Sequence, residues 1–146
     1  MIVIADSSGI LALFNRSDPV HFSVRRAADA ASALVVSPLA LTEVHHVASV
    51  RASRQVADAI LGLLADRADA GRVVMGAAGS TQLRAALDVR TAYSDVNLDL
   101  VDAMCVVLAA EYDTDAVLTL DRRDFRLLRP LRRYPAFRVL PDDLGP

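Results

Sequence analysis

The sequence predicts an α/β fold, a three-layer α/β/α sandwich with a small central parallel sheet. Predicted strands alternate with predicted helices along the chain. The strand cores are continuous apolar runs, which are typical of a parallel sheet covered by helices on both faces. No repeat, low-complexity tract or linker divides the chain, so we expect residues 1–146 to form a single domain.

The first half of the chain is predicted to contain two strands and four helices. The apolar runs IVIA and ALVV favour buried strands. Ser17 or Asp18 as N-cap and Pro19 in the first turn predict the start of a helix, and Ser37 before Pro38 predicts another. In chain order the elements are strand 2–5, helix 7–14, helix 17–31, strand 33–37, helix 37–51 and helix 54–70.

The second half continues the alternation. RVVMG, DAVLTLD and FRVLP are short apolar runs that favour strands, and the turn-rich segment YSDVN separates two helices. The predicted elements are strand 72–76, helix 80–90, helix 100–112, strand 115–121 and strand 137–141.

Composition narrows the class of protein. The hydrophobic fraction is 53% and the mean hydropathy is +0.33, which favours a covered sheet, a sizeable partner interface, or both. No apolar stretch approaches the roughly 20 residues of a membrane span, and the N-terminus does not resemble a signal peptide. With Cys105 as its single cysteine the chain has no internal disulfide, so we expect a cytoplasmic protein without a membrane partner.

The charge is unevenly distributed. The net charge is -2, and every basic residue is an arginine. A local arginine cluster can bind phosphate even on a neutral protein, although a solvated helix face is the alternative. Seven arginines lie close together near the C-terminus: Arg122, Arg123, Arg126, Arg129, Arg132, Arg133 and Arg138.

Acidic residues follow two of the predicted strands. Asp6 comes directly after strand 2–5, and Asp121 ends strand 115–121. Ligands of open α/β sheets bind beyond the carboxyl ends of the strands, where both acids are expected. Each acid could instead be a helix N-cap, Asp6 for helix 7–14 and Asp121 for a short helix over 122–128. Asp124 lies one helical turn after Asp121, and Thr119 is predicted to point to the same side of the strand as Asp121.

Asp102 is the single acid in the otherwise apolar run LVDAMCVVLAA. A helix that is apolar all round is buried, and a buried carboxylate requires a partner. No arginine lies between Arg90 and Arg122, so a bound metal ion is a natural partner. The alternative is stabilisation by the N–H groups of the first helical turn. We interpret Asp99 as the N-cap and Asp102 as the inward-facing acid.

Glu43, in SPLALTEVHHV, is expected to lie above the carboxyl edge of the sheet, although an ordinary exposed glutamate is the alternative. Glu43 and His46 form a Glu-x-x-His pair, but a di-iron bundle requires two such pairs. With three histidines and one cysteine in total, the chain has too few nitrogen and sulfur ligands to favour a zinc site. The carboxylates favour hard cations such as Mg²⁺ or Mn²⁺.

Four segments together, VIADSS, TEV, DLVDAMCVVLA and AVLTLDRRDF, resemble the PIN domain, and specifically the VapC-type toxin ribonucleases of toxin–antitoxin pairs. The resemblance covers nearly the whole chain. It implies that Asp6, Glu43, Asp102 and Asp121 are the catalytic acids and metal ligands. It also implies supporting hydroxyl groups at Ser8 and Thr119, and leaves Asp99 and Asp124 as alternatives for the third and fourth acids.

The resemblance further implies Mg²⁺- or Mn²⁺-dependent hydrolysis of phosphodiester bonds in structured RNA, with tRNA and ribosomal RNA as leading candidates. Arg122, Arg123 and Arg126 directly follow a site acid and are predicted to contact phosphates. Partners implied by the family are a second copy of the chain and a cognate VapB-like antitoxin, which we expect to contact residues 10–28 and 44–65.

Three other functions are alternatives. A PIN-like fold could act as a non-catalytic binding partner, although the acids are intact. A receiver-like Mg²⁺-binding domain requires a lysine and a second acid beside Asp6, and the chain has neither. A phosphatase of the haloacid-dehalogenase type would carry D-x-D-x-T where this chain has Asp6-Ser7-Ser8.

Overall fold

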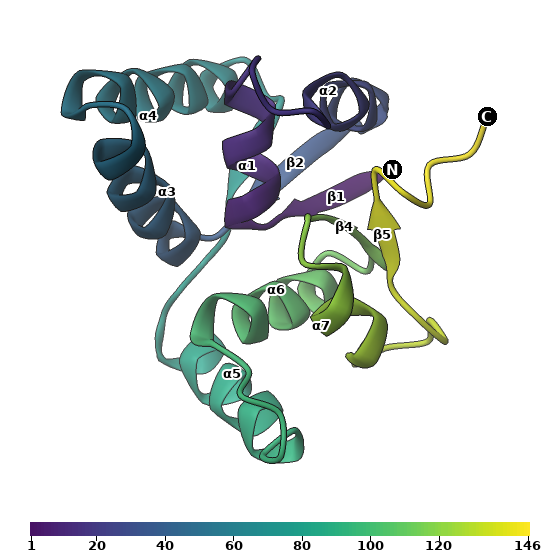
Figure 1. Ribbon diagram of the computed structural model, residues 1–146. Coiled ribbons are helices and arrows are strands. Elements are labelled where there is room, and N and C mark those ends of the chain that lie inside the picture. The colour runs from purple at the N-terminus through teal and green to yellow at the C-terminus, as the bar shows by residue number, and fades with distance from the viewer.

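A computed structural model describes residues 1–146. It contains a five-stranded sheet in the order β3-β2-β1-β4-β5, and every neighbouring pair of strands is parallel. Helices cover both faces of the sheet (Figure 1), and the three-layer α/β/α prediction is confirmed. The strands are β1 (Ile2–Ala5), β2 (Ala33–Val36), β3 (Val73–Met75), β4 (Ala116–Leu118) and β5 (Arg138–Leu140).

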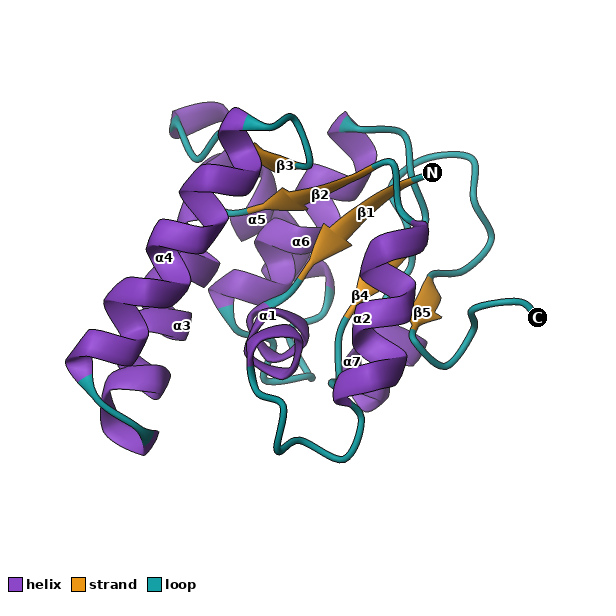
Figure 2. Cartoon of the chain, turned by 90° about the horizontal axis from the view of Figure 1, so that it is seen from above, coloured by secondary structure: helices purple, strands orange, loops and turns teal.

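Seven helices connect the strands and lie in two layers. Figure 2 shows the strands side by side, with α1 and α2 in front of them and α5 and α6 behind. The first layer consists of α1 (Ser7–Phe14), α2 (His21–Ala30), α3 (Pro38–Arg51) and α4 (Arg54–Asp69). The second consists of α5 (Ser80–Ala92), α6 (Leu100–Glu111) and α7 (Arg122–Leu127). None of the helices is long and apolar enough to span a membrane.

The pleat of the strands divides the core in two. Val3 and Ala5 of β1 belong to the cluster beneath α1–α4, whereas Ile4 between them belongs to the cluster beneath α5–α7. Successive side chains of a strand point to opposite faces, so a continuous apolar run serves two helical layers at once. Helix α6 lies deepest, because all its residues from Asp102 to Ala109 are buried.

Most predicted boundaries differ from the structure by at most two residues, and two differ by more. The second helix begins at His21 and not near Asp18, because Asp18 Oδ1 accepts a hydrogen bond from Val20 N (2.9 Å) and holds Pro19 in a turn. Strand β4 ends at Leu118 and not at Asp121. The backbone leaves the sheet there because two side-chain hydroxyl groups accept the N–H groups of Leu120 and Asp121.

The strand order defines where a ligand can bind. From β1 the chain proceeds outward to β2 and β3, then crosses to β4 on the other side of β1. The order therefore reverses between β1 and β4, and open α/β sheets bind their ligands at such a point, beyond the carboxyl ends of the strands.

Candidate active site

Asp6 lies at this switch point, directly after β1, and only 3% of it is exposed. Its Oδ1 accepts a hydrogen bond from Ser7 N (2.7 Å), so Asp6 is the N-cap of α1. Its Oδ2 accepts a hydrogen bond from Thr119 Oγ1 (2.9 Å). Burial raises the pKa of Asp6 to about 6, although these hydrogen bonds oppose the shift. Capping and a place in the acidic site are therefore compatible for this residue.

Thr119 and Ser8 connect Asp6 to the chain that leaves β4. Thr119 Oγ1 accepts a hydrogen bond from Asp121 N (2.9 Å) while it donates to Asp6. Ser8 Oγ accepts a hydrogen bond from Leu120 N (2.9 Å) and lies 3.2 Å from Thr119 Oγ1 and 3.3 Å from Asp6 Oδ2. The two hydroxyl groups thus fix the direction in which Asp121 leaves the sheet.

Asp102 enters the site from the first turn of α6 and is only 4% exposed. Asp99 is the N-cap of this helix, because its Oδ1 accepts a hydrogen bond from Asp102 N (2.8 Å), which confirms the predicted cap. The Asp102 carboxylate forms neither a hydrogen bond nor an ion pair. Burial, followed by the nearby charges of Asp6 and Asp99, raises the pKa of Asp102 to about 9.

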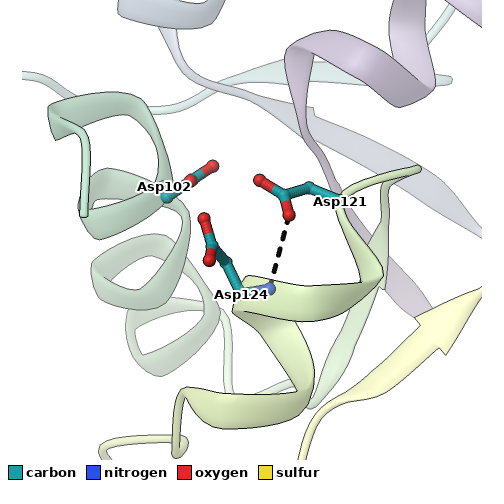
Figure 3. A group of neighbouring side chains, drawn as sticks. All are labelled: Asp102, Asp121 and Asp124. Atoms are coloured by element: carbon teal, nitrogen blue, oxygen red, sulfur yellow. Dashed lines mark hydrogen bonds between the residues drawn. The ribbon is translucent and has the colours of Figure 1, made fainter. Parts of the chain in front are cut away.

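Three carboxylates meet at this point. Asp102, Asp121 and Asp124 each offer an oxygen atom, and these oxygens lie within 4.8 Å of one another. Figure 3 shows the three side chains converging from α6 and from the start of α7. Asp121 is the N-cap of α7 and accepts a hydrogen bond from Asp124 N (3.3 Å), so the turn that orients Asp121 also places Asp124. Burial raises the pKa of Asp121. Both Asp121 and Asp124, the two predicted alternatives for the fourth acid, belong to the cluster.

Glu43 does not join these three carboxylates. It is exposed on α3 and lines a groove of about 550 Å³, together with Ser7 and Ser8 at the end nearest the site. Its charge contributes to the raised pKa of Asp6, which places it within electrostatic range of the cluster. The structure therefore brings Asp102 and Asp121 together, adds Asp124, and leaves Glu43 at the rim.

Two of the three arginines predicted to contact phosphate are already paired. Arg122 forms an ion pair with Asp142, and Arg126 binds Asp143 through both of its Nη atoms at 2.6 and 2.7 Å. Arg123 is exposed and forms no ion pair or side-chain hydrogen bond. Asp142 and Asp143 were not predicted, because their local sequence carries no signal of this pairing. The pairing depends on the fold, which brings the C-terminal segment beside α7.

The donor set fits a hard divalent cation. No arginine forms an ion pair with any of the five site acids, which are Asp6, Asp99, Asp102, Asp121 and Asp124. No histidine or cysteine belongs to the three-carboxylate cluster. His45 is bound to Asp58 (2.7 Å) and His21 to the carbonyl of Ala12 (2.9 Å). Oxygen-only ligands are those that Mg²⁺ and Mn²⁺ prefer, whereas zinc prefers nitrogen and sulfur.

Comparison with known proteins agrees with this geometry. The family model of the PIN domain matches residues 3–129. The chain is 37% identical over 130 residues to Ribonuclease VapC26 of Mycobacterium tuberculosis (strain ATCC 25618 / H37Rv), covering 88% of this chain and 93% of that protein.

Solved structures share the fold at low sequence identity. Mycobacterium tuberculosis VapC20, described as a sarcin–ricin loop cleaving toxin, matches with a TM-score of 0.73 and 17% identity, covering 84% of this chain and 92% of that one. VapBC2 from Rickettsia felis, bound to a DNA fragment from its promoter, matches with a TM-score of 0.67 and 12% identity, covering 95% and 98%. The chain belongs to the PIN domain family and is a VapC-type member of it.

Proposed function

We propose that this chain is a divalent-metal-dependent endoribonuclease that acts as the toxin of a toxin–antitoxin pair. The observation that carries the proposal is the group of three converging carboxylates, with Asp6 beside it, none of which forms an ion pair with an arginine. The charge of Arg123 opposes the raised pKa of Asp121 but does not cancel it. Such carboxylates repel one another unless a cation binds between them, and burial together with this repulsion raises the pKa of Asp102. The identity to Ribonuclease VapC26 supports RNA as the substrate.

In this proposal Asp102, Asp121 and Asp124 hold Mg²⁺ or Mn²⁺, and Asp6 completes the site from β1. When bound, the cation supplies the positive charge that stabilises developing negative charge on the cleaved phosphodiester. Thr119 and Ser8 orient Asp6 and the chain that carries Asp121. Glu43, exposed at the rim, has a carboxylate that can accept a proton from a water molecule entering from the groove.

Arg123 is the arginine best suited to a substrate phosphate, because it is exposed and follows a site acid without an ion pair of its own. Arg122 and Arg126 would have to leave Asp142 and Asp143 to do the same. The chain has no tryptophan and few aromatic residues, which disfavours an extensive base-stacking surface. We therefore expect structured RNA, tRNA or ribosomal RNA, to be recognised through its shape and backbone.

A VapB-like antitoxin is the proposed protein partner. The groove that reaches Glu43 is lined largely by apolar residues of α1, α3 and α4, within the predicted contact segments 10–28 and 44–65. The VapBC2 complex of Rickettsia felis supports this partner class. We also propose a homodimer and a single domain over 1–146. Exposed apolar side chains outside these segments, such as Leu131 (55%) and Leu87 (52%), are compatible with a further interface.

The proposal is tested by incubating the purified chain with total cellular RNA in the presence of Mg²⁺ or Mn²⁺ and mapping the cut ends. We expect discrete internal cuts that disappear in EDTA and in Asp102→Asn. Wild-type cleavage that persists in EDTA would contradict the metal mechanism. Binding of RNA without any cleavage would favour the non-catalytic alternative.

A further inference from the structure

Gly9 lies in the first turn of α1, where the helix backbone contacts the end of β4. A Cβ atom at Gly9 would lie 2.3 Å from the carbonyl oxygen of Leu118 and 2.8 Å from its carbonyl carbon. The same carbonyl oxygen accepts the hydrogen bond from Asp6 N (3.0 Å) that continues the pairing of β1 with β4. Only a hydrogen atom fits between helix and strand at this point, because backbone cannot yield as a flexible side chain can.

This contact sits beside the hydroxyl network of the acidic site. Ser8, the residue before Gly9, receives the hydrogen bond from Leu120 N (2.9 Å). Thr119, the residue after Leu118, donates to Asp6 and accepts from Asp121 N. The closeness of α1 to β4 therefore determines whether Ser8 can reach the chain that leaves the sheet, and how that chain presents Asp121.

We propose that Gly9 is a positioning residue of the site. The absence of a side chain lets α1 approach β4 closely enough for Ser8 and Thr119 to fix the position of Asp6 relative to Asp121. A methyl group at position 9 must displace α1 from β4, lengthen the contact between Ser8 and Leu120 N, and shift Asp6 relative to Asp121. The role in catalysis rests on the proposed metal-dependent cleavage of RNA, whereas the displacement itself does not.

The chain offers a matched control. Gly62 lies inside α4, is exposed, does not line the groove, and has no atom within 4 Å of the position that its Cβ would take. It falls within segment 44–65, which we expect to contact the antitoxin, so all variants are compared without antitoxin. Gly9→Ala and Gly62→Ala make the same chemical change in a helix, and both remove a glycine that disfavours helix. A difference between the two variants therefore reports the contact with Leu118 and not helix propensity.

The experiment compares both variants with wild type by amide hydrogen exchange at Leu120 and Asp121, Mn²⁺ calorimetry and cleavage kinetics. For Gly9→Ala we expect roughly tenfold faster exchange at these amides while β1 stays protected. We also expect about tenfold weaker Mn²⁺ binding and up to about 100-fold lower kcat, with KM changed by less than about threefold. Gly62→Ala is expected to match wild type.

Equal exchange, Mn²⁺ affinity and kcat in Gly9→Ala and Gly62→Ala would overturn the inference. If Gly9→Ala does not fold, Ser8→Ala decides, because it removes the hydroxyl group without adding bulk. Faster exchange at Leu120 and weaker Mn²⁺ binding in Ser8→Ala support the inference, and wild-type behaviour overturns it. A wild-type chain that neither binds Mn²⁺ nor cleaves RNA would instead refute the proposed function, and the exchange comparison alone would then decide the role of Gly9.

Discussion

Two acidic regions of this molecule have opposite environments. Each of four aspartates is paired with an arginine of residues 122–138, and we call these four pairs the C-terminal flank. Hydrogen bonding to Arg126 lowers the pKa of Asp143. At the carboxyl edge of the sheet the acids have no arginine partner, and burial raises the pKa of Asp102 to about 9. The flank pairs are Arg122–Asp142, Arg126–Asp143, Arg133–Asp113 and Arg138–Asp115.

Under the proposed function, this difference separates structural carboxylates from catalytic ones. Sixteen basic residues are available, and the fold directs none of them into an ion pair with the site acids. Exposed ion pairs contribute little to stability, so we expect the pairs of the flank to change the free energy of unfolding only slightly. Unpaired buried carboxylates are costly and persist where a ligand compensates them, which points to a cation at the sheet edge.

The largest expected effect comes from removing one charge at the sheet edge. Asp6→Asn and Asp102→Asn are each expected to lower RNA cleavage by roughly 1,000-fold or more, because a weakened cation site forfeits several kcal/mol of transition-state stabilisation. Initial rates with Mn²⁺ measure the effect.

Asp113→Asn is the matched control from the flank. Asp113 has a positive φ of 48°, which asparagine tolerates, and its partner Arg133 forms no ion pair with a site acid. Its cleavage rate is expected to equal that of wild type. Undiminished cleavage by Asp6→Asn or Asp102→Asn would remove that acid from the site.

A second expectation concerns stability without metal. Because the folded-state pKa of Asp102 is raised, the folded protein holds a proton that the unfolded chain has lost between about pH 4 and pH 9. The stabilisation of the folded state by protonated Asp102 is therefore complete below about pH 4 and is lost as the pH rises towards 9. In EDTA, wild type should become less stable from pH 6 to pH 9.

Asp102→Asn should flatten this profile and be more stable than wild type at pH 8, by on the order of 5 kcal/mol, because the amide cannot ionise. Urea unfolding at several pH values checks the slope. A flat wild-type profile, or an equal slope in Asp102→Asn, would mean that Asp102 ionises as easily as an exposed acid.

A smaller effect is expected among the arginines. Arg123→Ala should raise KM for RNA by up to about tenfold. It should also reduce the slope of log KM against log salt concentration by about one, the change expected for the loss of one phosphate contact. Arg122→Ala should change KM less, because Asp142 already holds its guanidinium group. Kinetics at several salt concentrations separate the two, and an equal or larger effect of Arg122→Ala would show that the ion pair opens to admit RNA.

Much of the fold could be predicted, because apolar runs mark the strands and capping residues mark most helix starts. The site could be predicted in part. Asp6 and Asp121 follow β1 and β4, whose ends meet at one edge of a parallel sheet, and Asp102 lies in the first turn of α6. The position of Glu43 depends on where α3 directs its outer face, which local sequence does not encode.

The ion pairs of Arg122 and Arg126 could not be predicted from local sequence either. Asp142 and Asp143 reach α7 only after the chain has turned back to form β5. The end of β4 was mispredicted for a related reason. The run DAVLTLD is apolar enough for a longer strand, but the Ser8 hydroxyl, contributed from more than a hundred residues away, takes the N–H of Leu120.

The most direct test of the central claim is a calorimetric titration of the metal-free chain with Mn²⁺ at pH 8, made in parallel on wild type, Asp102→Asn and Asp113→Asn. We expect wild type and Asp113→Asn to bind Mn²⁺ alike, and Asp102→Asn to bind at least about tenfold more weakly. No binding to wild type, or equal binding to Asp102→Asn, would contradict the claim that the unpaired carboxylates at the sheet edge form a metal site.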